Sequence, residues 1–254
     1  MSEDFLSVRI LAVCASEPDG ELLRQGATLA VIPAYFTHVA TAAAARAALA
    51  EGNVDIALLD SAMASRDMKE VFAAVRSARN PPSVVMVAPS SQEAADLAAA
   101  GVVDAIAVKP AKLPDAKALI ESCMRLKIPS RVLVVDDSST TRSIVRKILN
   151  GCRFPLDVSE AGDGIDALKQ IGVGKFDFVL LDYHMPGLDG LEMLPQLRRQ
   201  HPRMEIVMMT SAQDEALAAL AREGGAVAFL RKPFYSSDID AILYAIHRLR
   251  PPPP

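Results

Sequence analysis

The stretch "FVLLDYHMPGLDG", residues 178–190, decides the fold because it joins a continuous apolar run to an acid and a tight turn. Four apolar residues in a row are typical of a strand that is buried on both faces of a parallel sheet. The run ends at Asp182, and the Pro-Gly and Asp-Gly pairs that follow are turn signals. We therefore expect Asp182 at the carboxyl end of a buried strand, where ligands of such sheets bind.

Similar apolar runs surround this stretch throughout the second half of the chain. Strands are expected over residues 132–135, 156–160, 178–181, 205–209 and 227–230. Segments with helical periodicity follow them, over residues 139–149, 164–171, 188–200, 214–223 and 236–248. This alternation predicts an α/β domain in which a five-stranded parallel sheet carries helices on both faces.

The first half of the chain repeats the second. "RILAVCAS" from Arg9 matches "RVLVVDDS" from Arg131, 122 residues later. The same offset, with one extra residue in the last pair, relates Asp60 to Asp182, Ala88 to Thr210 and Lys109 to Lys232. We predict two copies of one domain, over residues 1–127 and 128–254, with a proline-rich tail on the second.

Composition limits the possible function classes. The chain has 254 residues, 51% of them hydrophobic, a net charge of −4 and no stripe of Lys and Arg, so we expect binding to neither nucleic acid nor a membrane. Three widely spaced cysteines in apolar surroundings are typical of reduced thiols in a cytoplasmic protein. The uncharged residues 27–45 are interpreted as a helix end, a loop, a strand and a helix start. The acidic start "MSEDFLSVRI" has no long apolar stretch, so we expect no secretory signal there.

Polar residues follow the predicted strands of the second copy at one edge of the sheet. Asp136 and Asp137 end the first strand, Asp182 the third and Thr210 the fourth, while Lys232 follows the fifth. Crowded carboxylates raise one another's pKa, and Mg²⁺ together with the lysine would neutralise them. Such a site can accept a phosphoryl group, because cation and lysine balance its charge while Asp182 attacks in line. A single acid would more often be a helix N-cap, but five residues in order on one edge argue against coincidence.

The motifs "VDDS", "LLDYHMPGLDG", "MMTSA" and "FLRKPF" resemble the receiver domain of bacterial response regulators, which has a flavodoxin-like (βα)5 fold. The resemblance covers the second copy from end to end. It implies a histidine kinase or phosphotransfer protein as the phosphate donor, Mg²⁺ as the cofactor and a downstream protein as the signalling partner.

The resemblance also implies a role for each site residue. Asp182 is the expected phosphoacceptor, with Thr210 contacting the phosphoryl group and Lys232 pairing with it. Asp136, Asp137, Asp182 and the backbone carbonyl of His184 are the expected magnesium ligands. Phe229 matches the aromatic residue that moves when the domain is phosphorylated, and the Lys232–Pro233 bond is expected to be cis.

The first copy resembles a degenerate receiver. Several family positions are replaced there: Cys14 and Ala15 stand at the acid pair, Ala88 at the threonine, Met63, Ala64 and Ser65 at the Met-Pro-Gly turn, and Ile106 at the switch aromatic. Asp60 and Lys109 remain, and we expect them to form a direct ion pair without metal, stabilising by about 1 kcal/mol or less if exposed. This copy would then serve as a regulatory or interaction module.

These observations predict a response regulator without an output domain, since a single helix remains between Lys232 and the final "PPPP". It would signal by a surface conformational switch and catalyse only its own phosphorylation and dephosphorylation; a homodimer is compatible with this function. An alternative is a constitutive adaptor or phosphate sink that docks on a kinase. A phosphatase of the haloacid dehalogenase type is disfavoured, because His184 stands where that family needs a second aspartate.

Overall fold

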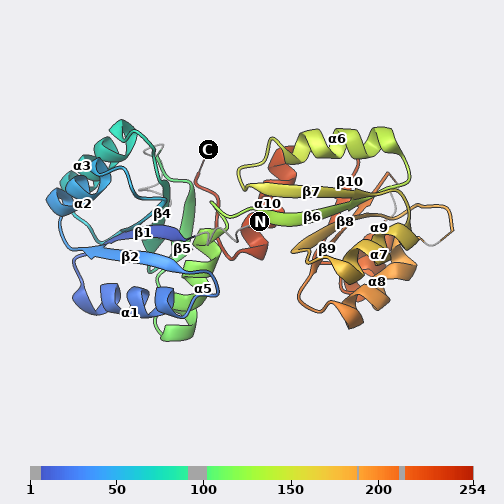
Figure 1. Ribbon diagram of the computed structural model, residues 1–254, viewed down its shortest axis with the longest axis horizontal. Coiled ribbons are helices and arrows are strands. Elements are labelled where there is room, and N and C mark those ends of the chain that lie inside the picture. Colours follow the sequence, from blue (N-terminus) through green and yellow to red (C-terminus); the bar gives the residue numbers. More distant parts are fainter. Residues whose placement is uncertain (1–6, 91–101, 188, 212–214, 254) are drawn as a thin grey trace. The chain divides into compact units, whose positions relative to one another are not determined.

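The structure, a computed structural model, describes residues 7–90, 102–187, 189–211 and 215–253 (Figure 1). It divides into two compact units, one of Met1–Lys127 with His247–Pro254 and one of Ile128–Ile246. The C-terminal segment, which we assigned to the second domain from the sequence, therefore groups with the first unit. The segments around the predicted helix starts at residues 188 and 214 lie outside the described residues.

The second unit has a five-stranded parallel sheet in the order β10-β9-β8-β6-β7. Its elements are β6 (Ser130–Val135), α6 (Ser139–Leu149), β7 (Leu156–Ala161), α7 (Gly164–Val173), β8 (Phe178–Asp182), α8 (Gly190–Gln200), β9 (Glu205–Thr210), α9 (Glu215–Glu223), β10 (Ala228–Arg231) and α10 (Ser236–Ile246). Counted along the unit, the strand order is 2-1-3-4-5, which is the flavodoxin-like order. The predicted fold class is confirmed.

The first unit repeats this topology, with the strand order β2-β1-β3-β4-β5. Its elements are β1 (Val8–Val13), α1 (Glu17–Thr28), β2 (Ala34–Val39), α2 (Ala42–Ala50), β3 (Ile56–Asp60), α3 (Ser65–Ser77), β4 (Ser83–Ala88), β5 (Ala105–Val108) and α5 (Leu113–Met124). The uncharged residues 27–45 form the end of α1, a loop, β2 and the start of α2, as expected. Within the described residues, no helix is both long and apolar enough to cross a membrane.

Helices cover both faces of each sheet (Figure 1). In the first unit α1 and α5 lie on one face and α2 and α3 on the other; in the second unit α6 and α10 lie on one face and α7, α8 and α9 on the other. The central strands β3 and β8 are buried at every residue, which accounts for their continuous apolar sequence. Each sheet thus presents its carboxyl edge as the place where polar groups can gather.

Local sequence signals define the first helix of the second unit. Ser138 is the N-cap of α6, and its hydroxyl accepts a hydrogen bond from the amide of Thr141 at 3.2 Å. Since a serine serves as the cap, Asp136 and Asp137 are left available for another role. At the other end of the unit α10 stops at Ile246, two residues before the predicted end, and Arg248 adopts a left-handed conformation with φ of 53°.

Candidate functional site

The parallel register of the second unit brings the predicted site residues to one edge. Val135 pairs with Leu181, and Asp182 pairs with Met209, so β6, β8 and β9 end at the same level. Asp136 follows the first of these strands and Thr210 ends the last. Because strand ends in a parallel sheet converge, residues far apart in the sequence share one pocket.

Three carboxylates meet in this pocket. Asp136, Asp137 and Asp182 each offer an oxygen, and these oxygens all lie within 4.8 Å of one another. Asp136 and Asp182 are buried, with 1% and 7% of their surface exposed, whereas Asp137 is exposed. Within the described part of the chain, no other group of three or more His, Cys, Asp or Glu side chains is arranged in this way.

Lys232 links two of the three acids. Its Nζ donates to Asp136 Oδ2 at 2.6 Å and to Asp182 Oδ1 at 2.7 Å. Burial raises the pKa of the Asp182 carboxyl, the hydrogen bond from Lys232 lowers it, and the charges of Asp136 and Asp137 raise it again, so that the pKa lies above its usual value. Burial alone would lower the pKa of Lys232, but hydrogen bonds to both acids outweigh it and the pKa is raised.

The donor set of this pocket fits a hard divalent cation. Three carboxylates against one ammonium leave an excess of two negative charges, in a place where the acids are partly shielded from water. Mg²⁺ prefers oxygen ligands and usually takes only one or two carboxylates, keeping room for water and a phosphate oxygen. Asp136, Asp137 and Asp182 are the residues that could hold it.

The remaining predicted residues lie around the same edge. Thr210 is fully buried at the end of β9, and Phe229 is half-buried in β10, where it pairs with Met208 and packs on the core cluster. The side chain of His184 is exposed, and its ring lies edge-on against Tyr183 with centroids 4.4 Å apart. Its carbonyl as a metal ligand stays a prediction, whereas the expected cis bond between Lys232 and Pro233 is present.

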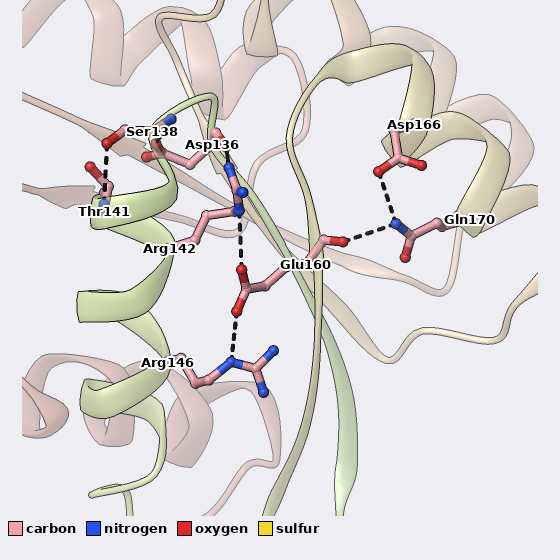
Figure 2. A network of polar contacts seen from close by, with 8 residues as sticks. All are labelled: Asp136, Ser138, Thr141, Arg142, Arg146, Glu160, Asp166 and Gln170. Atoms are coloured by element: carbon pink, nitrogen blue, oxygen red, sulfur yellow. Dashed lines mark hydrogen bonds and ion pairs between the residues drawn. The ribbon is translucent and has the colours of Figure 1, made fainter.

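An arginine beside the pocket was not among the predicted residues (Figure 2). Arg142 Nη1 donates to the backbone carbonyl of Asp136 at 2.7 Å, and its Nε donates to Glu160 Oε2 at 3.1 Å. Arg146 Nε donates to the other oxygen of Glu160 at 2.6 Å, and Gln170 donates to the Glu160 carbonyl at 2.9 Å. The network ties α6 and α7 to the ends of β6 and β7. The sequence offered one sign of this network, the spacing of Arg142 and Arg146 four residues apart, which places both on one face of α6.

The corresponding pocket of the first unit is built differently. Lys109 Nζ lies 2.8 Å from Asp60 Oδ2, which confirms the predicted direct ion pair. It also lies 2.7 Å from Asp19 Oδ2, a partner that we did not predict. Two carboxylates therefore face one ammonium in this pocket. The stabilisation of about 1 kcal/mol or less that we expected for an exposed ion pair does not apply here, because the Asp60 side chain is only 6% exposed.

Cys14 lines this first pocket, and His38 contacts it. His38 Nε2 lies 2.9 Å from the Cys14 carbonyl and 3.3 Å from Cys14 Sγ. The 122-residue offset relates Cys14 to Asp136 and His38 to Glu160. His38 thus contacts the backbone carbonyl of Cys14 in the first unit, as Arg142 contacts the equivalent carbonyl of Asp136 in the second. Burial, and then the charges of Asp60 and Asp19, raise the pKa of Cys14 to about 11. The cavity left beside these residues has a volume of about 10 Å³, on the order of one water molecule.

Comparison with known proteins points to the same half of the chain. Residues 132–244 match the family model of the response regulator receiver domain. The cyclic di-GMP phosphodiesterase response regulator RpfG of Xanthomonas campestris is 36% identical over 121 residues, covering 47% of this chain and 32% of that protein. The alkaline phosphatase synthesis transcriptional regulatory protein PhoP of Bacillus subtilis is 36% identical over 118 residues, covering 46% of this chain and 48% of that protein. The aligned part thus spans between about a third and a half of these relatives.

Solved structures resemble the fold as well. A probable two-component system response regulator/GGDEF domain protein covers 94% of this chain and 99% of its own, with 25% identity and a TM-score of 0.49. A response regulator from Thermotoga maritima covers 48% of this chain and 99% of its own, with 23% identity and a TM-score of 0.42. The family match over residues 132–244 falls on the unit that holds the acidic pocket, so the second unit is similar to the response regulator receiver domain.

Proposed function

We propose that the second unit accepts a phosphoryl group on Asp182 from a histidine kinase or a phosphotransfer protein, in a reaction that requires Mg²⁺. The observation that carries this proposal is the contact of Lys232 with both Asp136 and Asp182, inside a cluster of three acids. A lysine beside a strand-end aspartate serves phosphoryl transfer, because it balances charge on the incoming group without competing as a nucleophile while protonated.

The proposed chemistry uses this chain's own side chains. An Asp182 oxygen attacks phosphorus, and the phosphorus–nitrogen bond of the donor phosphohistidine breaks with its electron pair going to the imidazole. Lys232 pairs with a phosphoryl oxygen, and the Thr210 hydroxyl donates to another. When bound by Asp136, Asp137 and Asp182, Mg²⁺ supplies further charge neutralisation at the phosphoryl oxygens. Water later hydrolyses the acyl phosphate and returns the carboxylate.

We further propose that phosphorylation is read out at the surface of the second unit. Thr210 and Phe229 lie on adjacent strands, β9 and β10, with Arg231 pairing Thr210 across them. A threonine that moves toward a phosphoryl group leaves space into which the half-buried Phe229 ring can turn. The outer face of β10 then differs between the two states, and a downstream protein partner can distinguish them.

The first unit acts in this proposal as an interaction module that is not itself phosphorylated. Its lysine is held by two acids, and Cys14 and Ala15 stand where the second unit has its acid pair, so fewer carboxylates are available to a magnesium ion. Ala88 supplies no hydroxyl at the place of Thr210. These features support loss of the phosphoryl-transfer chemistry with retention of the fold.

The test uses the full chain, acetyl phosphate and Mg²⁺, with intact-mass measurement. The wild type should gain one phosphoryl group, Asp182→Asn should gain none, and the matched control Asp60→Asn should behave like the wild type. Removal of magnesium by chelation should abolish the gain. Phosphorylation that survives in Asp182→Asn, or that disappears in Asp60→Asn, would overturn the proposal.

The adaptor alternative separates from the switch in a binding experiment. If the chain is a switch, binding to its partner changes when beryllofluoride and Mg²⁺ are added, and Asp182→Asn removes that change. If the chain is a constitutive adaptor or a phosphate sink, binding stays the same with and without beryllofluoride.

A further inference from the structure

The chain returns to its first unit after the last helix of its second. α10 ends at Ile246, Arg248 turns the backbone with φ of 53°, and Leu249 is buried with 3% of its surface exposed. Arg250 then forms an antiparallel bridge with Ile106 in β5. The Ile106 amide donates to the Arg250 carbonyl at 2.9 Å, and the Arg250 amide donates to the Ile106 carbonyl at 2.8 Å. The C-terminal end accordingly lies with the first unit (Figure 1).

The position of β5 explains why it can accept this segment. β5 is the last strand in the order β2-β1-β3-β4-β5, so only one of its sides is paired within the sheet. An edge strand presents backbone donors and acceptors to which an extended peptide can add as a further strand. Arg250 satisfies both backbone groups of Ile106 at this edge. On the inner side, Lys109 donates its amide to the Ala88 carbonyl at 2.8 Å, independently of the C-terminal segment.

The sequence of the segment limits the added strand to a short length. Prolines follow from position 251 to the end of the chain and have no amide hydrogen to donate. The bridge therefore cannot extend into a longer ladder, and it rests on one residue pair and one buried leucine. Contacts of this size open and close more readily than a full strand pairing.

A groove lies next to the bridge, and Arg248 of the C-terminal segment is part of its lining. A groove of about 260 Å³ runs along β5 and α5, and its lining includes Val108, Asp115, Leu119 and Arg248. Asp115 is exposed in the first turn of α5, so an acid and the arginine of the C-terminal segment line one groove. Lys109 lines the same groove, so the assignment of the occupant rests on the backbone bridge between Arg250 and Ile106.

We propose that the outer edge of β5 is a peptide-capture surface and that its occupant is the chain's own segment Arg248–Arg250. This inference rests on the proposed role of the first unit as an interaction module and names its partner: the segment that follows α10 in the same chain. Capture is reversible and closes the β5 edge to other strands while it lasts. It requires no phosphorylation, so it can stand or fall separately from phosphoryl transfer at Asp182.

Amide hydrogen exchange on the full chain tests the capture. Arg250→Pro removes the donor to Ile106 and, by its fixed φ, disfavours the bridge; we expect the Ile106 amide to exchange at least about tenfold faster. The Lys109 amide is the internal reference and should keep its protection, which shows that the sheet is intact. The matched control Pro251→Ala restores an amide next to the bridge and should leave Ile106 protected. Unchanged exchange at Ile106 in Arg250→Pro would overturn the proposal.

A second measurement distinguishes capture within one chain from exchange between two. Protection of Ile106 should not vary with protein concentration, and loss of protection on dilution would overturn capture within the same chain. Leu249→Ser removes the buried side chain but leaves the backbone donor. Trypsin should cut after Arg248 faster in this variant than in the wild type, and equal rates would contradict the proposed burial of the segment.

Discussion

Lys232 Nζ lies 2.6 Å from Asp136 and 2.7 Å from Asp182, and Lys109 Nζ lies 2.8 Å from Asp60 and 2.7 Å from Asp19. Both units therefore hold a lysine between two acids at the same edge of the sheet. In the second unit a third acid, Asp137, completes the cluster. Two surplus negative charges in the second unit, against one in the first, support our proposal of a magnesium site in the second unit.

Replacing Lys232 by methionine should make the stability of the protein depend on magnesium. The apolar stem stays while the ammonium is lost, and the buried Asp136 and Asp182 are left without their cation beside the exposed Asp137. We expect a loss of about 3 kcal/mol in the free energy of unfolding at pH 7 without magnesium. Added Mg²⁺ should restore part of the loss, because it takes over the charge neutralisation. Urea denaturation with and without magnesium measures both effects.

Lys109→Met is the matched control for that experiment. Two acids are left without their cation there as well, so a loss of stability is expected. Magnesium should reverse it less, because two carboxylates remain there against three in the second unit. Equal recovery of the two variants on adding Mg²⁺ would contradict a metal site confined to the second unit.

The ion network of Figure 2 predicts a pH dependence. The hydrogen bond from Arg146, followed by that from Arg142, outweighs partial burial and lowers the pKa of Glu160 below its usual value of 4.5. A lowered carboxyl pKa stabilises the folded state above the usual pKa, and that stabilisation is lost as the pH falls through the lowered value. Glu160→Gln should therefore cost about 0.5–1 kcal/mol at pH 7, and the cost should shrink toward about pH 3.

Urea denaturation of the wild type and Glu160→Gln at both pH values checks this prediction. High salt at pH 7 should reduce the difference between the two proteins, since the ion pairs are partly exposed. A difference that is the same at pH 7 and about pH 3 would mean that Glu160 stabilises by packing and not by charge.

Most of the fold could be predicted because buried parallel strands leave a strong local signal. The run that ends at Asp182 became β8 with a shift of one residue, since backbone pairing continues through the acid at the strand end. The acids at strand ends could be predicted to share a pocket for the same reason: topology alone brings them together. The 122-residue repeat then predicted the same fold for the first unit.

The residues that could not be predicted depend on contacts across elements. Asp19 reaches Lys109 from the first turn of α1, and the repeat aligns it with Thr141, so comparison of the two copies showed no acid there. The pairing of Arg250 with Ile106 is equally invisible to local patterns. His247 and Arg248 continue a helical pattern in sequence, yet α10 ends before them because the chain turns toward another strand.

The cysteines of the first unit should be poorly reactive. Burial raises the pKa of Cys123 to about 12, and burial together with nearby acids raises that of Cys14 to about 11. The thiolate is the reactive form, so both residues are almost fully protonated at pH 8. We expect iodoacetamide to modify them slowly in the native protein and quickly in urea, where the pKa returns toward about 8.5. Peptide mass spectrometry follows each site, and rapid native labelling of Cys14 would contradict its burial.

Gly190 packs closely against Asp182, the proposed phosphoacceptor. It begins α8, donates its amide to the Tyr183 carbonyl at 3.2 Å, and lies so close to Asp182 that a methyl group would overlap the Asp182 carbonyl oxygen. It would also lie 3.0 Å from the Met208 side chain. Gly190→Ala must therefore push α8 away from the end of β8, or shift Asp182 itself.

We expect Gly190→Ala to lower the free energy of unfolding by about 2 kcal/mol, as overpacking of a buried contact does. Phosphorylation by acetyl phosphate should fall as well, because Asp182 no longer faces Lys232 at the same distance. The matched control is Gly172→Ala in the last turn of α7, where nothing lies within 4 Å of the added methyl group. That variant should be neutral or gain up to about 1 kcal/mol from helix propensity and should be phosphorylated normally. If the two alanine variants were equally stable and equally active, the close packing of α8 against Asp182 could not be what positions the carboxylate.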